Sequence, residues 1–222
     1  MLVIFDCDGV LVDSESLANR VLAAYLTELG LPTTFDESVA RYIGTSIASV
    51  RAKAEADLGR PLPDDFETEL WARDRVVFDR DLKPISGVAA ALKAIVAGGG
   101  ETCVASSGSP QKIRHSLSLT GLGQHFDERI YSASQVAHGK PAPDLFEFAA
   151  RQMSAAVDDC LVIEDSTAGV TAARAAGMRV FGFTGGGHAT PTLAETLKAA
   201  GAALVFDNMR RLPGLVADDQ RL

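Results

Sequence analysis

The sequence predicts an α/β fold, with a Rossmann-like doubly wound parallel sheet and a small helical domain inserted after the first strand. Two observations lead to this prediction. Short apolar runs alternate with helical patterns over residues 85–222, and residues 14–84 show helical periodicity without a convincing strand. Strands that alternate with helices along a chain form parallel sheets that are covered on both faces.

Six apolar runs rich in β-forming residues predict the strands. They span residues 2–5, 102–105, 129–131, 160–163, 179–183 and 203–206. Helical patterns between the later runs predict helices over residues 88–97, 110–119, 143–153, 167–176 and 192–200. Glycines follow several of these patterns and prolines begin two of them, as is typical of helix ends and first turns.

Residues 14–84, which we call the insert, predict four helices over residues 15–29, 35–42, 47–58 and 64–81. A segment of this length can form a small domain of its own. We therefore expect a core domain of residues 1–13 and 85–222, and a helical cap domain formed by the insert.

The composition is that of a folded globular protein, with 222 residues of which 47% are hydrophobic. The net charge of −8 and the scattered Lys and Arg residues argue against a nucleic-acid partner. We find neither a signal peptide nor an apolar run of membrane-spanning length, so we expect a cytoplasmic protein with no membrane partner. The three distant cysteines predict buried, reduced thiols. We expect a monomer or a weak dimer.

Two acidic pairs follow predicted strands. Asp6 and Asp8 come directly after the first strand, where Gly9 permits a sharp turn, and Glu164 and Asp165 follow the fourth. A solvated acidic turn, or the capping of the next helix, would explain either pair alone. Because the carboxyl ends of parallel strands meet at one edge of a sheet, the two pairs together favour an oxygen-rich site for a hard cation such as Mg²⁺.

Two further motifs have an anion-binding character. Ser106, Ser107 and Gly108 end the second strand and lead into a helix N-terminus, where free amides bind anions. Lys140 lies between turn residues before the fourth strand. Taken alone, the first motif is also a common loop, and an isolated loop lysine is usually solvated.

These four elements, in this order, resemble the haloacid dehalogenase superfamily. The matching segments are DCDGVLVDSE, VASSGS, GKPAPD and IEDSTAGVTAARAAG. These segments are similar in sequence to those of the subgroup that contains sugar-phosphate phosphatases and β-phosphoglucomutase. The resemblance spans nearly the whole chain, including the helical insert, and it is more specific for the core chemistry than for the substrate.

The resemblance implies a mechanism. Asp6 would attack phosphorus and become an aspartyl phosphate, which water then hydrolyses, while Asp8 first donates and then accepts a proton. Ser106 and Lys140 would bind phosphoryl oxygens. A magnesium ion would be held by Asp6, the main-chain carbonyl of Asp8, Asp165 and, directly or through water, Glu164.

The resemblance also implies a small phosphorylated substrate such as a sugar, sugar-acid or polyol phosphate. We expect the insert to close over the site and select this substrate, because Asp13 and Pro84 mark two short connections that can serve as hinges. We expect substrate contacts from residues beside the second strand and from the first part of the insert. These residues are Ser107, Gly108, Ser14, Ser16, Gly44, Thr45 and Ser46.

The main alternative is a phosphomutase of the β-phosphoglucomutase type. Such mutases carry a histidine and an arginine where this chain has Ala18 and Ile47. Because a mutase needs a cationic group to hold a second phosphate, these two residues favour a phosphatase. Three further alternatives agree less well with the sequence. A dehalogenase would have no leaving alcohol for Asp8 to protonate, and a phosphorelay receiver is not expected to contain an insert of this size. A non-catalytic phosphate-binding protein would not need the complete set of motif residues.

Overall fold

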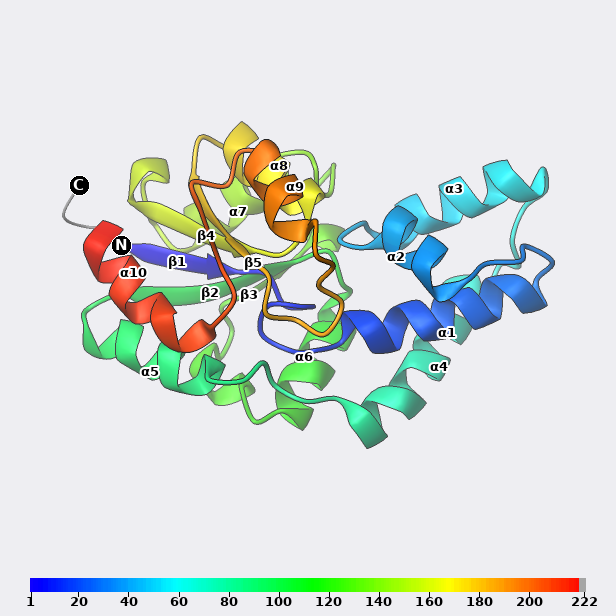
Figure 1. The fold of residues 1–222 in the computed structure, drawn as a ribbon, viewed down its shortest axis with the longest axis horizontal. Coiled ribbons are helices and arrows are strands. Elements are labelled where there is room, and N and C mark those ends of the chain that lie inside the picture. The colour runs from blue at the N-terminus through cyan, green and yellow to red at the C-terminus, as the bar shows by residue number, and fades with distance from the viewer. Residues whose placement is uncertain (220–222) are drawn as a thin grey trace.

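The computed structural model describes residues 1–219 and contains one six-stranded parallel sheet (Figure 1). The strand order is β3-β2-β1-β4-β5-β6. The strands span Leu2–Phe5 (β1), Glu101–Ser106 (β2), Ile130–Ser132 (β3), Cys160–Glu164 (β4), Arg179–Phe183 (β5) and Leu204–Phe206 (β6). This doubly wound α/β architecture confirms the fold class predicted from the sequence.

Helices cover both faces of the sheet, because alternate strand residues point to opposite faces. Val3 and Phe5 of β1 pack in the hydrophobic cluster that includes α5 (Val88–Ala97), α6 (Pro110–Leu119) and α10 (Leu212–Asp219). Leu2 and Ile4 pack in the opposite cluster with α7 (Asp144–Gln152), α8 (Thr167–Ala175) and α9 (Leu193–Ala199). The strands are therefore buried on both faces, as their continuous apolar runs predict.

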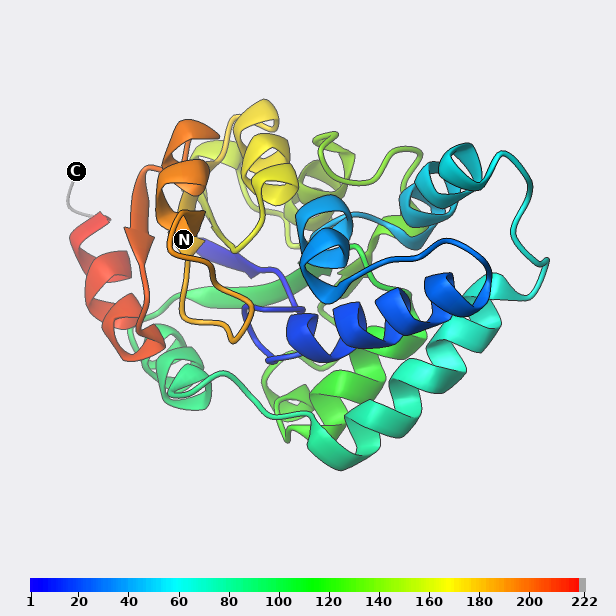
Figure 2. The same cartoon turned by 45° about the vertical axis from the view of Figure 1, so that its right-hand side comes forward.

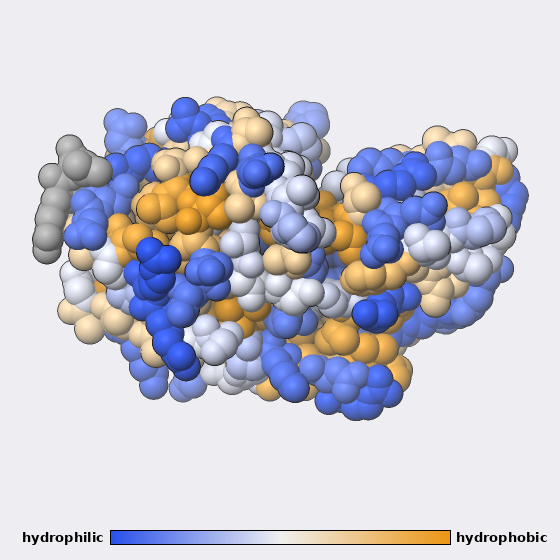
Figure 3. All heavy atoms as spheres, in the orientation of Figure 1, coloured by the Kyte–Doolittle hydropathy of each residue, from blue (hydrophilic) through white to orange (hydrophobic). Residues whose placement is uncertain are grey.

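The insert contains α1 (Glu15–Glu28), α2 (Phe35–Tyr42), α3 (Ile47–Leu58) and α4 (Phe66–Asp81). These helices share a hydrophobic cluster of their own, in which Tyr25 and Phe66 stack with ring centroids 5.4 Å apart. Figure 2 shows α1 and α4 side by side, and Figure 3 shows a notch between the insert and the rest of the molecule along the upper edge. The division into core and cap domains at residues 13 and 84 remains our prediction.

Two connections join the insert to the sheet, and they run side by side. Asp13 donates a main-chain hydrogen bond to the carbonyl of Lys83 (2.9 Å), and Ile85 donates to the carbonyl of Leu11 (2.9 Å). Val12 and Pro84 form an antiparallel bridge between these bonds. The chain thus leaves the core and returns to it at one place.

Most predicted element boundaries lie within two residues of the observed ones. The exception is α10, for which we predicted no element. Its first turn contains Pro213 and Gly214, which weaken a helical pattern in the sequence. The helix forms because Leu212 and Val216 pack in the same cluster as α5. No helix within residues 1–219 has both the length and the apolar composition required to cross a bilayer.

Candidate active site

The predicted motif residues converge at the carboxyl edge of the sheet because β1 lies between β2 and β4. Phe5 pairs with Val104 of β2 and with Ile163 of β4, so the ends of these three strands are level. Asp6 follows β1 directly, Ser106 ends β2, and Glu164 ends β4. Residues that are widely separated in the sequence therefore meet at one place.

Lys140 lies at the centre of this group and is 3% exposed. Its ammonium group donates to Asp6 Oδ1 (2.7 Å), to Glu164 Oε1 (2.7 Å) and to the carbonyl of Ala105 (3.0 Å). Burial opposes the charge, but the two carboxylates outweigh it and raise the pKa of Lys140. All three donors of this lysine are satisfied, so its position is fixed.

The second carboxylate oxygen of Glu164 is also held by hydrogen bonds. Its Oε2 accepts hydrogen bonds from the main-chain amide and the hydroxyl of Ser166, both at 2.9 Å. Gly169 packs against this carboxylate so closely that an added Cβ would lie 1.8 Å from Oε1. Glu164 therefore fixes Lys140, and through it the carboxylate of Asp6.

The carboxylates at this edge fit a bound cation. Burial raises the pKa of Asp6, Lys140 lowers it, and the charges of Glu164, Asp165 and Asp8 raise it further. Burial likewise raises the pKa of Asp165, whose Oδ2 is buried and has no hydrogen-bond partner within the described residues. A divalent cation would supply both the missing charge and the missing partner.

Gly9 makes room for this arrangement. Its φ of 78° is a left-handed conformation, and an added Cβ would lie 1.8 Å from Asp165 Oδ2. Within residues 1–219, no three His, Cys, Asp or Glu side chains form a metal-binding cluster. The site implied by the sequence resemblance does not need one, because a main-chain carbonyl and water complete it.

Asp8 contacts one residue of the insert and one residue of the core. Ser14, which is fully buried, donates its hydroxyl to Asp8 Oδ1 (2.5 Å), and Lys112 Nζ lies 3.3 Å from Asp8 Oδ2. In the neighbouring loop, Ser106 Oγ accepts a hydrogen bond from the amide of Gly108 (3.1 Å).

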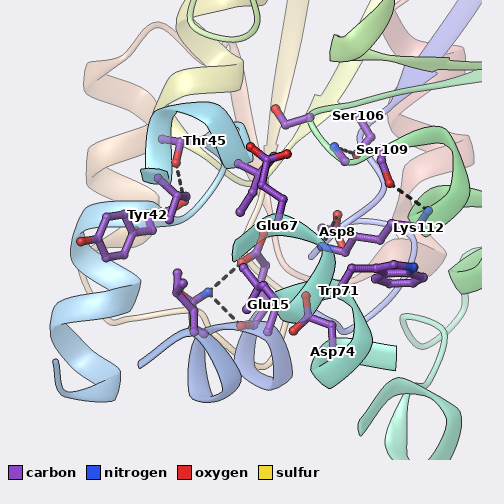
Figure 4. A pocket seen from close by; sticks show the side chains of 18 of the residues that line it. Asp8, Glu15, Tyr42, Thr45, Glu67, Trp71, Asp74, Ser106, Ser109 and Lys112 are labelled. Carbon is purple, nitrogen blue, oxygen red and sulfur yellow. Dashed lines mark hydrogen bonds and ion pairs between the residues drawn. The ribbon is translucent and has the colours of Figure 1, made fainter. Parts of the chain in front are cut away.

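A cavity of about 340 Å³ opens between the carboxyl edge and the insert (Figure 4). Its size suits a small metabolite. It brings together residues of the core and of all four helices of the insert or the loops beside them. Its lining comprises Asp6, Asp8, Glu15, Ala18, Asn19, Leu22, Tyr42, Gly44, Thr45, Ile47, Val50, Glu67, Thr68, Leu70, Trp71, Asp74, Ser106, Ser107, Gly108, Ser109, Gln111 and Lys112.

The predicted substrate contacts from the insert fall into two groups. Gly44 and Thr45 line the cavity, and the Gly44 carbonyl also accepts a hydrogen bond from Ser107 Oγ (3.3 Å). Ser14, Ser16 and Ser46 lie outside the lining. Ser14 is used by Asp8, and Ser46 caps α3 by accepting a hydrogen bond from the Ser49 amide (3.3 Å).

Comparison with known proteins decides the family. Residues 1–177 match the model of the haloacid dehalogenase-like hydrolases. The chain belongs to this family. It is 33% identical to the 6-phosphogluconate phosphatase of Escherichia coli over 96% of this chain and 93% of that protein. It is also 30% identical to the fructose-1-phosphate phosphatase of Escherichia coli, over 79% and 92% of the two chains.

Among solved structures, the hydrolase is similar to a conserved haloacid dehalogenase-like protein of unknown function from Agrobacterium tumefaciens. The TM-score is 0.82 and the identity 37%, over 99% of this chain and 98% of that one. The family and the fold predicted from the motif wording are therefore confirmed.

The sequence reasoning missed Lys112 of the hydrolase. Burial opposes the charge of this lysine, but Asp8, Asp74 and Glu15 outweigh it and raise the pKa of Lys112. One signal was available: Lys112 lies in the first turn of α6, where a cation is unfavourable beside the helix dipole unless an acid compensates it.

His188 was missed as well. It follows three glycines after β5, and its ring is buried beside the site. Nε2 lies 3.1 Å from Asp165 Oδ2 without hydrogen-bond geometry, and burial lowers the pKa of His188. A polar residue after a glycine run at a strand end was the available signal.

Asp74 of α4 should make the free energy of unfolding depend on pH. Burial raises its pKa from the ordinary 3.8 to about 7, so the folded hydrolase loses stability as the pH rises from 3.8 through 7. Asp74→Asn removes this effect. We expect the variant to exceed the wild type by roughly 1–4 kcal/mol in free energy of unfolding at pH 8.5, and the two to converge below about pH 3.8.

Urea denaturation at several pH values measures this difference. The matched control is Asp64→Asn, an exposed aspartate that precedes the same helix. A difference between Asp74→Asn and the wild type that does not grow with pH would contradict the prediction.

Proposed function

We propose that the hydrolase is a magnesium-dependent phosphatase that acts on a small phosphorylated metabolite, a sugar, sugar-acid or polyol phosphate, through an aspartyl-phosphate intermediate on Asp6. One observation carries the proposal: Asp6, fixed by Lys140, faces the same cavity as Asp8 and Ser106. The names of the two phosphatase relatives support the reaction and the class of substrate.

In the first step, a carboxylate oxygen of Asp6 attacks phosphorus, and the bond between phosphorus and the leaving oxygen breaks. Asp8 gives its proton to the leaving alcohol. Lys140 remains bound to Asp6 Oδ1, so the second oxygen of Asp6 is the nucleophile. Ser106, at the end of β2, donates its hydroxyl to a phosphoryl oxygen.

In the second step, Asp8 removes a proton from water, the water oxygen attacks phosphorus, and the bond between phosphorus and Asp6 breaks. Inorganic phosphate and the free carboxylate of Asp6 are regenerated. Ser14 and Lys112 keep Asp8 in place for both proton transfers, because each contacts one of its two oxygens.

The residues that would hold magnesium are Asp6, the main-chain carbonyl of Asp8 and Asp165, with Glu164 beside them. When bound, the ion reduces the repulsion between the carboxylates and the phosphate. Asp165 Oδ2, which accepts no hydrogen bond within the described residues, supports this assignment. The insert, as the cap, keeps bulk water away from the phosphoryl group through its contact between Gly44 and Ser107.

A phosphomutase is less well supported than a phosphatase. Ala18 and Ile47 both line the cavity, and neither can hold a second phosphate. We expect β-glucose 1-phosphate with a trace of glucose 1,6-bisphosphate and Mg²⁺ to give free phosphate faster than glucose 6-phosphate. Coupled assays for the two products test this, and faster formation of glucose 6-phosphate would identify a mutase.

A screen of phosphorylated sugars, sugar acids and polyols tests the phosphatase itself. Release of phosphate should require Mg²⁺ and stop on chelation. A purified, folded protein that releases phosphate from no member of the panel would instead favour a non-catalytic phosphate-binding protein.

A further inference from the structure

The wall of the cavity that the insert provides is acidic. Glu67, Trp71 and Asp74 are spaced by four and three residues on α4, so they lie on one face of that helix and line the cavity (Figure 4). Glu15 of α1 lines the cavity beside them. The insert thus contributes three carboxyl groups to this wall.

The cavity contains little positive charge to balance them. Lys112 is the cationic side chain of the described lining, and its Nζ already lies 3.3 Å from Asp8 Oδ2. Lys140 is buried behind Asp6 and is bound to two carboxylates. The pKa of Glu15 is raised to about 8 by burial and by the charges of Asp8 and Asp165. An ionised carboxylate repels an anion, and a protonated carboxyl group donates one hydrogen bond but brings no positive charge.

The same wall is suited to hydroxyl groups. Asp74 Oδ1 is buried and has no hydrogen-bond partner within residues 1–219, so a substrate hydroxyl would satisfy it. Thr68 adds a hydroxyl group to the lining, whereas the Asn19 amide already donates to Glu15 and accepts from Ser38. Trp71 offers an apolar ring against which the C–H groups of a carbon chain can pack.

We propose that this wall selects phosphate monoesters of neutral polyhydroxylated compounds, sugars and polyols, and rejects those with a second anionic group far from the phosphate. This inference rests on the proposed phosphatase function and narrows its substrate class. A sugar-acid phosphate would place a carboxylate near the wall that contains Glu67 and Asp74, where an ionised carboxylate repels a like charge.

A matched pair of substrates tests the proposal. Glucitol 6-phosphate and gluconate 6-phosphate differ at one carbon, which carries a neutral hydroxymethyl group in the first and a carboxylate in the second. With Mg²⁺ at pH 7.5, we expect kcat/KM to be at least about tenfold higher for glucitol 6-phosphate. Added salt should reduce the ratio of the two kcat/KM values, because salt screens the repulsion between charges. Equal values, or a preference for gluconate 6-phosphate, would overturn the proposal.

Variants of Glu67 test whether this residue causes the preference for glucitol 6-phosphate. Glu67→Gln should reduce the ratio of the two kcat/KM values, and Glu67→Lys should reduce it further or reverse it. The matched control is Glu69→Gln, which removes the same charge from the same helix outside the cavity lining, where Glu69 pairs with Arg73. A ratio that neither Glu67 variant changes would also overturn the proposal.

Failure of this inference is distinguishable from failure of the proposed function. If phosphate is released and gluconate 6-phosphate is preferred, the phosphatase stands and the selectivity is wrong. If no phosphate is released from either compound or from the wider panel, the phosphatase itself is wrong.

Discussion

Asp6→Asn should abolish phosphate release, with a fall in kcat of at least about 10⁴-fold, as is found when an enzyme loses its nucleophile. An amide oxygen is a poor nucleophile and a weaker cation ligand than a carboxylate. The fold should be kept, because asparagine has nearly the same shape and Lys140 still pairs with Glu164. Phosphate release with the best substrate of the panel measures the effect.

Acid quenching during turnover adds a second readout. The wild type should show a phosphoryl group on the peptide that contains Asp6, and the variant should not. The matched control is Asp36→Asn, an exposed aspartate in the first turn of α2, which should keep nearly full activity. Hydrolysis by Asp6→Asn at a rate near that of the wild type would disprove the mechanism.

Lys140→Met should have the largest effect on stability. The variant leaves the buried carboxylates of Asp6 and Glu164 without their cation, and breaking a buried ion pair in this way costs about 3–5 kcal/mol. Activity should be lost as well, because Asp6 is no longer held. The loss of stability should be greater at pH 8 than at pH 5, where the carboxyl groups take up protons more readily.

Urea denaturation measures this loss, and a double variant tests its cause. Lys140→Met with Glu164→Gln removes one of the two unpaired charges and should recover part of the stability. Lys93→Met, on the exposed side of α5, is the control and should change stability by less than about 0.5 kcal/mol. A loss that Glu164→Gln deepens would contradict the electrostatic explanation.

The centre of the site could be predicted because it depends on the strands. Asp6, Ser106 and Glu164 each lie at the end of an apolar run, and parallel pairing makes those ends level. The order of the runs and the spacing of the motifs were therefore sufficient. The same reasoning gave nearly all helix boundaries, since apolar periodicity marks the buried face of each helix.

The outer part of the site could not be predicted in this way. Asp74 and Lys112 approach each other because α4 of the insert packs against α6 of the core, where Asp79 Oδ1 also lies 2.7 Å from His115 Nε2. No local pattern encodes the docking of two helices from distant segments. Ser16 and Ser46 lie outside the lining of the cavity, and their role as substrate contacts stays a prediction.

The paired connections at Asp13 and Lys83 constrain how the molecule can open. The two connecting segments of the chain are joined by hydrogen bonds on both sides of the bridge between Val12 and Pro84. They therefore resist sliding or twisting independently of each other. We therefore expect any swing of the insert to be a rotation about a single axis through these paired segments. If the insert closes over the site as we propose, each closure should return Glu67 and Asp74 to the same place in the cavity that Asp6 lines, so that selection of the substrate and alignment for the reaction occur together.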